Sequence, residues 1–506
     1  MEEKGVRGAR WTMLSYATNK ALTLATTLIL ARLLVPADFG LLALASFAIG
    51  AIGAVNDLGL WGVLIVRQDF DRRAQGTVLS IMLASRAVLT ALAIGFAQFA
   101  DDIFRQPRLD GVLTVLASSI LIGSITWFYD AILHRELEFG RRFAAQFADS
   151  VTYAAVTLTL AALGAGVWSL VAGQIAGLLA HTVMVVVLAP YRVRPAFERS
   201  IAREATSQGR GFVLQGGVAF LSQNADTVAV GRVLGAGPLG IYSMGYRLGQ
   251  LPSQAIADPA VQVSFPAFTR MRQRGEDIAA SFLSVLRLVA LVACPLGVLL
   301  SATSGPFTRT FFDANWLPMI GLLSVLGIWG AVRPVETTMG WLLNSVGEAN
   351  LMGTIAAGFL VLLVPAVFLA AHLSGLVAVA WVMLASLACS LGILSWLAAR
   401  KAAVPVAEQW RAVRPVVLAL PACWVAARLV AEALDASPAA LALAGSACAG
   451  MVAYVAAASL VERGLFPTAV RQAVRIFGRA RLGEDAVVAS PADPEPEPVA
   501  RYPRVP

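Results

Sequence analysis

Apolar runs of about 20 residues, the length at which a helix crosses the hydrocarbon layer of a bilayer, recur along the whole chain. Short turns or clusters of arginine separate them. Of the 506 residues, 58% are hydrophobic and 14% are charged, whereas soluble domains average about 45–50% and about 25%. We therefore predict an all-α polytopic membrane protein with 14 transmembrane helices. The predicted spans are residues 11–34, 39–60, 76–100, 111–133, 147–165, 169–189, 211–234, 239–262, 282–304, 318–341, 351–372, 376–399, 415–434 and 439–461.

The basic residues favour one of the two sets of connections between these spans. Of the 39 lysines and arginines, 28 lie in the N-terminus, in alternate loops and in the C-terminal tail. The other loops hold only Arg105, Arg108 and Arg309. The positive-inside rule then places both termini in the cytoplasm, in agreement with an even number of spans. Topology and contact with lipid headgroups explain the net charge of +8, so we expect no nucleic-acid partner.

No motif for covalent chemistry is found in the sequence. It has no GxxxxGK[ST] phosphate loop, no HExxH and no GxSxG motif. The three histidines are scattered, and the four cysteines lie in apolar spans without CxxC spacing. The opening MEEKGVRGAR leads into a run containing Asn19 and Lys20 with no cleavage signature, which indicates a retained first helix. We expect no enzyme activity, no catalytic residues, no cofactor and no metal site.

Two segments 200 residues apart, ARLLVPADFGLLALASFA at 31–48 and GRVLGAGPLGIYSMGYRL at 231–248, resemble each other. Their alignment pairs Arg32 with Arg232, Leu34 with Leu234 and Gly40 with Gly240. Each segment joins the first and second helix of a set of six. Sets separated by an even number of spans have the same orientation, as in parallel transporter repeats, which bind substrate where the halves meet.

This repeat predicts the domain organisation. Residues 1–190 form an N-terminal six-helix lobe and residues 191–400 a C-terminal six-helix lobe. Residues 401–461 add two transmembrane helices. Residues 462–506 hold a basic amphipathic helix on the inner leaflet, followed by a Pro- and Glu-rich tail that we expect to be disordered.

Polar side chains form stripes along the first two helices of each predicted lobe, and each stripe must face protein or a wet cavity because polar groups in hydrocarbon are costly. At 100° per residue, the stripe of the eighth span covers an arc of about 120°. One cavity between the lobes accounts for all four stripes. The stripe residues are Ser15, Asn19, Lys20, Thr23 and Thr26; Ser46, Gly50, Gly53 and Asp57; Gln215, Ser222, Gln223, Asn224 and Asp226; and Ser243, Arg247, Gln250, Gln254, Asp258 and Gln262.

Helix packing, lipid contact and ion pairing are alternative roles for some polar residues of the spans. Small Ser, Thr and Gly side chains also serve close helix packing, which is the favoured interpretation of the second span. Arg32, Arg232 and Arg287 lie near span ends and can snorkel to headgroups. Arg86 and the pair Arg333/Glu336 suit buried ion pairs.

Four segments resemble the polysaccharide-biosynthesis flippases of the MATE-like superfamily, the Wzx-type flippases of lipid-linked oligosaccharides. They are ARLLVPADFGLLALASFAIGAIGAVNDLGL, ILHRELEFGRR, NADTVAVGRVLGAGPLGIYSMGYRLGQLP and LLNSVGEANLMG. The resemblance implies two six-helix lobes around a central cavity and transport by alternating access. It further implies the bacterial inner membrane, and a polyprenyl-pyrophosphate-linked sugar repeat unit moved to the periplasmic leaflet for capsule, exopolysaccharide or O-antigen assembly. A polysaccharide polymerase and glycosyltransferases are its expected partners.

The stripes fit such a substrate. A pyrophosphate needs counter-charge, for which Lys20 and Arg247 are the candidates, with Arg232 as an entry or exit contact. The candidates for sugar binding are Asn19, Gln223, Gln250 and Gln254. The carboxylates that either couple transport to an ion or pair with the arginines are Asp57, Asp226 and Asp258. The alternatives are an ion-coupled drug or metabolite exporter on the same fold and a non-transporting scaffold.

Overall fold

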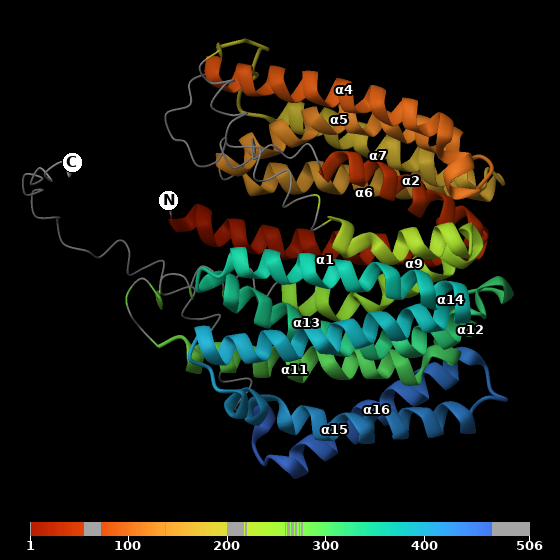
Figure 1. Cartoon of the computed structure of the whole chain (residues 1–506), viewed down its shortest axis with the longest axis vertical. Helices are drawn as coiled ribbons and strands as arrows, with labels where there is room; N and C mark the ends of the chain where they lie inside the picture. The colour runs from red at the N-terminus through yellow and green to blue at the C-terminus, as the bar shows by residue number, and fades with distance from the viewer. Residues whose placement is uncertain are drawn as a thin grey trace, which may run out of the picture.

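The computed structural model describes residues 2–54, 72–136, 138–199, 217, 220–258, 260 and 277–467, with single positions between 264 and 274. Within these residues every regular element is helical. The helices run side by side between two ends of the molecule, and α1 and α9 lie in the middle of the stack (Figure 1). The first group of helices consists of α1 Glu2–Leu33, α2 Pro36–Ala54, α4 Arg72–Phe104, α5 Leu109–Arg135, α6 Phe139–Ala162 and α7 Val167–Leu188.

The second group follows a helical segment at residues 220–233. It consists of α9 Ala236–Gly249, the π-helix η1 Ser253–Ala257, α11 Ala279–Ala302, the short α12 Ser304–Phe311, the 3₁₀ turn η2 Ala314–Trp316, α13 Met319–Ser345 and α14 Ala349–Lys401. Two further helices, α15 Val406–Ala433 and α16 Ala439–Val461, pack on α11. The helices follow the apolar runs because backbone groups within lipid must be satisfied inside the segment.

Each span predicted from sequence overlaps a helical segment of the described chain. Nine helices of the described chain are long and apolar enough to cross a membrane. One of them, α14, is interrupted at Gly375, whose φ of 73° and ψ of −156° only glycine adopts readily, and this break lies between the predicted spans 351–372 and 376–399. The all-α membrane fold is confirmed, whereas the count of 14 spans stays a prediction, as does the division into four domains.

Both copies of the repeat turn at equivalent positions. The first copy ends α1 at Leu33 and begins α2 at Pro36, with proline at a helix start, where its missing N–H is no loss. The second copy leaves its helix after residue 233 and begins α9 at Ala236. Gly235 makes this turn with a φ of 92°. The spacing of 200 residues therefore holds for the structure as well as for the sequence.

The two copies contact each other reciprocally. A methyl group added to Gly40 would lie 1.8 Å from the carbonyl oxygen of Ala236, and one added to Gly240 would lie 1.7 Å from that of Pro36. Because residues 36 and 40 meet residues 240 and 236, the contact has the self-complementary pattern of a two-fold arrangement. Glycine is required here so that the backbones of α2 and α9 can touch.

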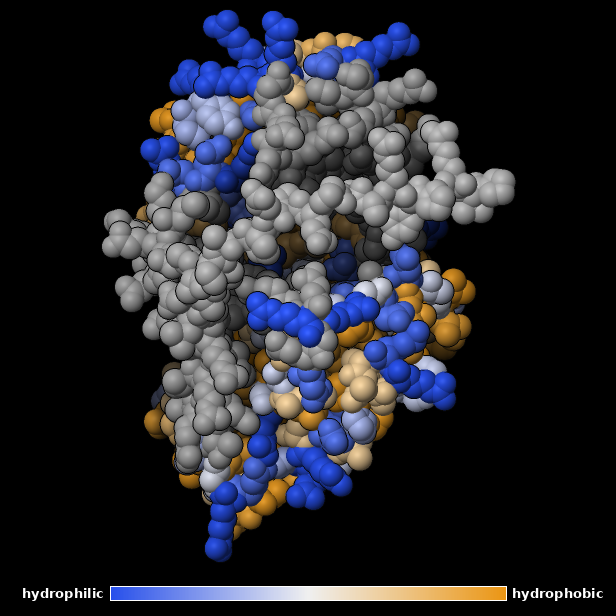
Figure 2. All heavy atoms as spheres, turned by 90° about the vertical axis from the view of Figure 1, so that its left-hand side faces the viewer, coloured by the Kyte–Doolittle hydropathy of each residue, from blue (hydrophilic) through white to orange (hydrophobic). Residues whose placement is uncertain are grey.

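The ends of the molecule differ in charge. Near the N-terminus lie the end of α5, the start of α6, residues 191–199 and the end of α14, which carry Arg135, Arg141, Arg142, Arg192, Arg194, Arg199, Arg400 and Lys401. Figure 2 looks onto this end and shows hydrophilic residues gathered on it, with hydrophobic residues on the flanks. We call it the basic end, and the opposite end, where α1 turns into α2, the distal end.

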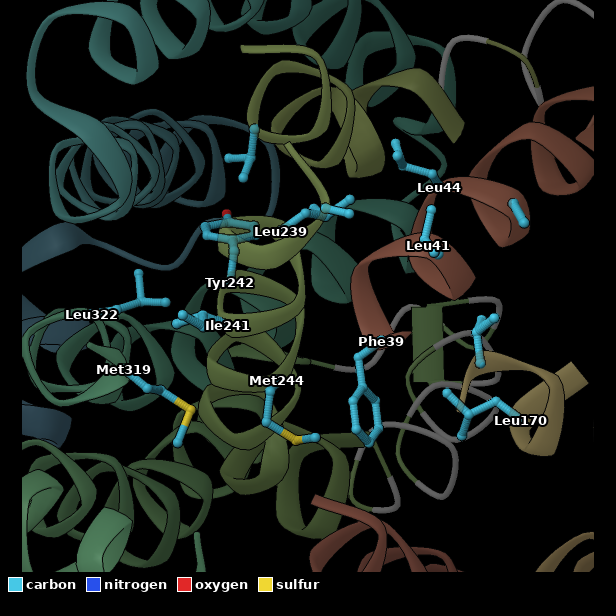
Figure 3. Packing of buried hydrophobic residues seen from close by; sticks show 14 of the residues in the cluster. Phe39, Leu41, Leu44, Leu170, Leu239, Ile241, Tyr242, Met244, Met319 and Leu322 are labelled. Atoms are coloured by element: carbon cyan, nitrogen blue, oxygen red, sulfur yellow. The ribbon is translucent and has the colours of Figure 1, made fainter. Parts of the chain in front are cut away.

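Among the described residues, the core cluster that joins the two helix groups lies toward the distal end. One cluster combines residues of α1, α2, α5 and α7 with residues of α9, α13 and α14. Figure 3 shows α9 packed between Phe39 and Leu44 of α2 on one side and Met319 and Leu322 of α13 on the other. Toward the basic end, one cluster draws on residues 74–193 and a separate one on residues 257–404. The described chain is therefore sealed at its distal end, and its two groups keep separate cores at the basic end.

Candidate functional site

A polar contact connects the two helix groups near the middle of α1. The Nζ atom of Lys20 donates a hydrogen bond to Oε1 of Gln254 at 2.7 Å, and Nε2 of Gln254 donates to Oε1 of Gln250 at 3.0 Å. The side chain of Lys20 is exposed, and those of Gln250 and Gln254 are half-buried. The sequence predicted that these residues face a shared space, and the structure brings them together.

The eighth predicted span is not one continuous α-helix. The helix α9 ends at Gly249, and Pro252 precedes the π-helix η1. Proline lacks the N–H needed for an interior helical hydrogen bond, and π-turns widen a helix, often at functional sites. Gln254 lies in this π-turn and accepts the hydrogen bond from Lys20 there.

Charged side chains continue this site along the second group. Asp258 is half-buried and lies within electrostatic range of Lys20 and Arg333. The guanidinium of Arg333 forms a 3.1 Å ion pair with Glu336, as the sequence suggested. Ser390 of α14 donates to the other carboxylate oxygen of Glu336 at 2.9 Å. Arg333 therefore pairs within its own helix group, whereas Asp258 of the second group also lies near Lys20 of the first.

Arg247 occupies the last turn of α9 and is exposed. It lies within electrostatic range of Tyr153 on α6, which belongs to the other helix group. Within the described residues Arg247 makes no hydrogen bond or ion pair. A cation in a membrane helix that faces the opposite group is suited to meet an anion between the groups.

Asp226 has a different environment. It is 2% exposed, and the hydroxyl of Tyr242 donates to its Oδ2 at 2.6 Å. The backbone N–H of Thr227 donates to its Oδ1 at 2.8 Å, so a tyrosine and a main-chain group bond this carboxylate, and not the arginines considered from the sequence. The ring of Tyr242 stacks on Tyr246, with ring centroids 6.0 Å apart, so Asp226 is buried behind two aromatic rings.

The remaining candidates are spread over the interface. Asn19 is half-buried beside Lys20, and Gln223 is exposed on the 220–233 helix. Arg232 is half-buried near the distal end of that helix, away from the turn that carries Gln254. Asp57 lies outside the described residues, as do Gln215, Gln262 and most of the predicted amphipathic helix.

Two arginines that the sequence placed near headgroups bind protein instead. The guanidinium of Arg287 forms an ion pair with Glu462, which follows α16. Arg32 donates to backbone carbonyls of α12. Snorkelling is therefore the wrong description of Arg287, because the carboxylate that neutralises it comes from a distant part of the chain.

Sequence reasoning missed the contribution of the fifth predicted span. Tyr153 on α6 lies within electrostatic range of Arg247, and Oδ2 of Asp149, one turn away, lies 3.4 Å from Nδ1 of His181. The polar run Asp149, Ser150, Thr152 and Tyr153 was the available signal. No group of three or more His, Cys, Asp or Glu side chains with metal-binding geometry occurs among the residues that were placed.

Two solved structures of membrane proteins share this fold. The chain superposes on the lipid II flippase MurJ, solved in an inward closed conformation, with a TM-score of 0.73 and 13% identity, covering 91% of this chain and 100% of that one. A MATE-family multidrug transporter in an inward-facing conformation gives 0.60 and 15%, covering 76% and 95%. At these identities the likeness establishes the fold: a multi-pass membrane protein of the MurJ and MATE type.

Relatives in sequence carry names from polysaccharide assembly. The lipopolysaccharide biosynthesis protein WzxC of Escherichia coli (strain K12) is 23% identical over 385 residues, which cover 75% of this chain and 77% of WzxC. The teichuronic acid biosynthesis protein TuaB of Bacillus subtilis (strain 168) is 27% identical, with 65% and 68% covered. The succinoglycan biosynthesis transport protein ExoT of Rhizobium meliloti (strain 1021) is 25% identical, with 68% and 70% covered.

A family model matches the part of the chain that contains both copies of the repeat. It covers residues 29–321, more than half of the sequence. These residues include the reciprocal contact between Gly40 and Gly240 and, except for Asn19 and Lys20, all the site residues predicted from the sequence. The chain belongs to the family of polysaccharide biosynthesis proteins.

Proposed function

We propose that this protein is a flippase that moves a lipid-linked oligosaccharide across the membrane by alternating access. The substrate is a polyprenyl-pyrophosphate-linked repeat unit, taken from the cytoplasmic leaflet of the bacterial inner membrane and released in the periplasmic leaflet. Membership of the polysaccharide biosynthesis family and the fold shared with a lipid flippase support this proposal. The drug-exporter alternative has less support, because the relatives found by sequence are named for polysaccharide assembly.

The hydrogen bond between Lys20 and Gln254 carries the proposal. It places a cation and two amide side chains between helix groups whose cores are separate at the basic end. Phosphate oxygens accept from ammonium and guanidinium groups, and sugar hydroxyls pair with amides. Such a site suits a ligand with an anionic linkage next to a glycan.

Each candidate residue has a role in this proposal. Lys20 and Arg247 hold the pyrophosphate, and Arg232 meets it near the distal end. The sugar contacts Asn19, Gln223, Gln250 and Gln254. The lipid tail stays in the bilayer, so the protein shields only the polar part. Asp258 and Asp57 are proposed to balance the cations or to carry a coupling ion, and Asp226, bonded to Tyr242, is proposed to support the packing of α9.

The charge distribution supports an orientation. With the basic end in the cytoplasm, the separate cores open toward the leaflet in which the substrate is assembled, and the sealed distal end faces the periplasm. Both termini are then cytoplasmic. Glycosyltransferases that complete the substrate would act at the basic end, and the polymerase that consumes it would act at the distal side.

The leaflet distribution of the lipid-linked oligosaccharide in cells that lack this protein tests the proposal. A membrane-impermeant glycan-binding reagent is added outside, after the outer membrane has been opened. We expect the intermediate to accumulate out of reach of the reagent and to become reachable when the protein is re-expressed. An intermediate that stays equally accessible with and without the protein would contradict the flippase, and retention of another solute would then favour the exporter.

The same assay tests the lysine. Lys20→Ala removes the cation that Gln254 holds, so we expect accumulation similar to that in cells lacking the protein. Lys401→Ala is the matched control. Lys401 is the last residue of α14 and forms a 3.1 Å ion pair with Glu348, which directly precedes α14, so this pair involves no residue of α1. Full export with Lys20→Ala would remove Lys20 from the proposed site.

A further inference from the structure

Arg32 connects the two helix groups at the distal end. It lies in the last turn of α1, which packs along α6 in the first group. Its Nε atom donates to the carbonyl oxygen of Phe311 at 3.1 Å, and its terminal nitrogen donates to that of Thr310. Both carbonyls belong to α12, in the second group. One side chain therefore bonds the two groups to each other.

The acceptors explain why an arginine is suited to this position. Carbonyls in the last turn of a helix lack intrahelical partners and carry the negative end of the helix dipole, which favours a cation. The planar guanidinium can reach two neighbouring carbonyls at once, whereas an ammonium group is a point charge. The contact thus uses groups of α12 that its own helix leaves unpaired.

Buried aromatic packing accompanies this contact. Phe39 of α2 meets Trp316 of η2 edge-on, with ring centroids 5.4 Å apart, and Phe312 packs on the same indole at 5.3 Å. Trp316 is fully buried. These rings belong to the core cluster that both groups share. The arginine therefore lies at the surface of the layer that closes the distal end.

The repeat does not provide a second copy of this bond. Arg232 occupies the equivalent position 200 residues later, but within the described chain it makes no hydrogen bond or ion pair. Its turn lies beside the α4–α5 connection, where the Cβ position of Gly235 is 3.2 Å from Nε2 of Gln106. The bond is thus one-sided, although the backbone contact of Gly40 and Gly240 is reciprocal.

We propose that Arg32 is a latch that holds the distal end closed while the basic end is open. The inference rests on the proposed function to the extent that alternating access requires the distal end to open. Separation of α1 from α12 breaks both hydrogen bonds, and the released carbonyls and guanidinium then become hydrated. Loss of the latch shifts the population toward the state that is open at the distal end.

A buried cysteine in the core that the two groups share at the distal end reports that state. The four native cysteines are replaced by alanine, and Ala236→Cys is added, because Ala236 is 6% exposed and its backbone meets Gly40 across the interface. The purified protein in lipid nanodiscs reacts with a charged maleimide. We expect Arg32→Ala to raise the labelling rate about tenfold, which corresponds to about 1.4 kcal/mol in the ratio of open to closed states.

Two further variants keep the test decisive. Arg309→Ala removes an arginine of α12 that pairs with the exposed Asp435, and we expect it to leave the rate unchanged. Arg32→Lys keeps the positive charge but loses the planar guanidinium that reaches both carbonyls, so it should give an intermediate labelling rate. This variant also tests the proposal if Arg32→Ala does not fold. A rate unchanged by both Arg32 variants, or raised equally by Arg309→Ala, would overturn the latch.

This readout is independent of the substrate. Labelling needs no lipid-linked oligosaccharide, so failure of the leaflet experiment with unaltered protein would refute the proposed function and leave the labelling result valid. Conversely, normal labelling in Arg32 variants alongside normal flipping would refute the latch alone.

Discussion

At the scale of single residues, the exposed cation of α9 is the most direct test of the substrate's charge. Arg247→Ala should abolish export and leave the amount of protein in the membrane near normal, because Arg247 is exposed and no described residue depends on it for a hydrogen bond. The leaflet assay measures export, and immunoblotting of membranes measures abundance. Arg428→Ala is the control, since the Arg428 side chain is 42% exposed on a membrane helix and pairs with Glu432 on the same helix. Export that survives the Arg247 change would remove this residue from the site.

The buried carboxyl group of Asp226 should contribute to stability. Tyr242→Phe removes the donor at 2.6 Å and leaves a buried acceptor with one partner fewer, at a cost of about 1–3 kcal/mol. We expect a lower midpoint in thermal unfolding of the detergent-solubilised protein. Tyr454→Phe, which loses a bond to the backbone carbonyl of Leu291 at 2.9 Å, should cost less because that acceptor is neutral. Equal midpoints for the two variants would show that Asp226 does not depend on Tyr242.

The sequence located several of these residues but not their partners. Helical periodicity put Lys20 and Gln254 on facing stripes, and they form a hydrogen bond. The same reasoning could not find the bond of Arg32, because its acceptors are main-chain carbonyls that any residue of α12 supplies. It also left open which group pairs with Asp226, since Tyr242 lies on a face of α9 outside the polar stripe.

At the scale of helices, the contact between α2 and α9 leaves no room for side chains. Gly240→Ala should separate the two helices, because the added methyl group would overlap the carbonyl oxygen of Pro36, and such overpacking costs about 1–3 kcal/mol. Gly40→Ala should have a similar effect by reciprocity. We expect a lower yield of monodisperse protein and a lower thermal midpoint for both. Gly237→Ala, on the same helix with no atom within 4 Å of its Cβ position, should behave as the unaltered protein, and equal behaviour of all three would contradict the close contact.

Helix boundaries could be predicted from the sequence where an apolar run ends in a turn. The repeat placed the turn of the second half at the position equivalent to the turn of the first half. The break after α9 was not predicted, although Pro252 lies in the eighth span. Proline is tolerated in membrane helices when neighbours satisfy the freed groups, so its presence alone does not reveal a π-turn. Tyr153 was missed for a related reason: its helix has a polar run too short to form a stripe along the whole span.

At the scale of the whole molecule, the core that is shared at the distal end and divided at the basic end predicts that a water-soluble reagent reaches the space between the helix groups from the basic end alone. In a background without the native cysteines, Gln223→Cys should react with a charged maleimide in inside-out vesicles and not in right-side-out vesicles, because its side chain is exposed and the distal end is sealed. Native Cys389, retained alone as the control, is exposed within an apolar helix and should react slowly from either side. Labelling of position 223 from the distal side alone would reverse the proposed orientation.

The sealed distal core also determines where the membrane voltage acts. In the proposed orientation, with the basic end in the cytoplasm, solvent at the exposed side chains of Lys20 and Arg247 brings the cytoplasmic potential deep into the protein, so most of the voltage falls across the thin layer around Phe39 and Trp316. Each charge that passes this layer exchanges about 2.3 kcal/mol per 100 mV with the field. With a negative interior, an anionic headgroup moving outward is driven in the direction of export, while the cations that receive it stay attached to their helices.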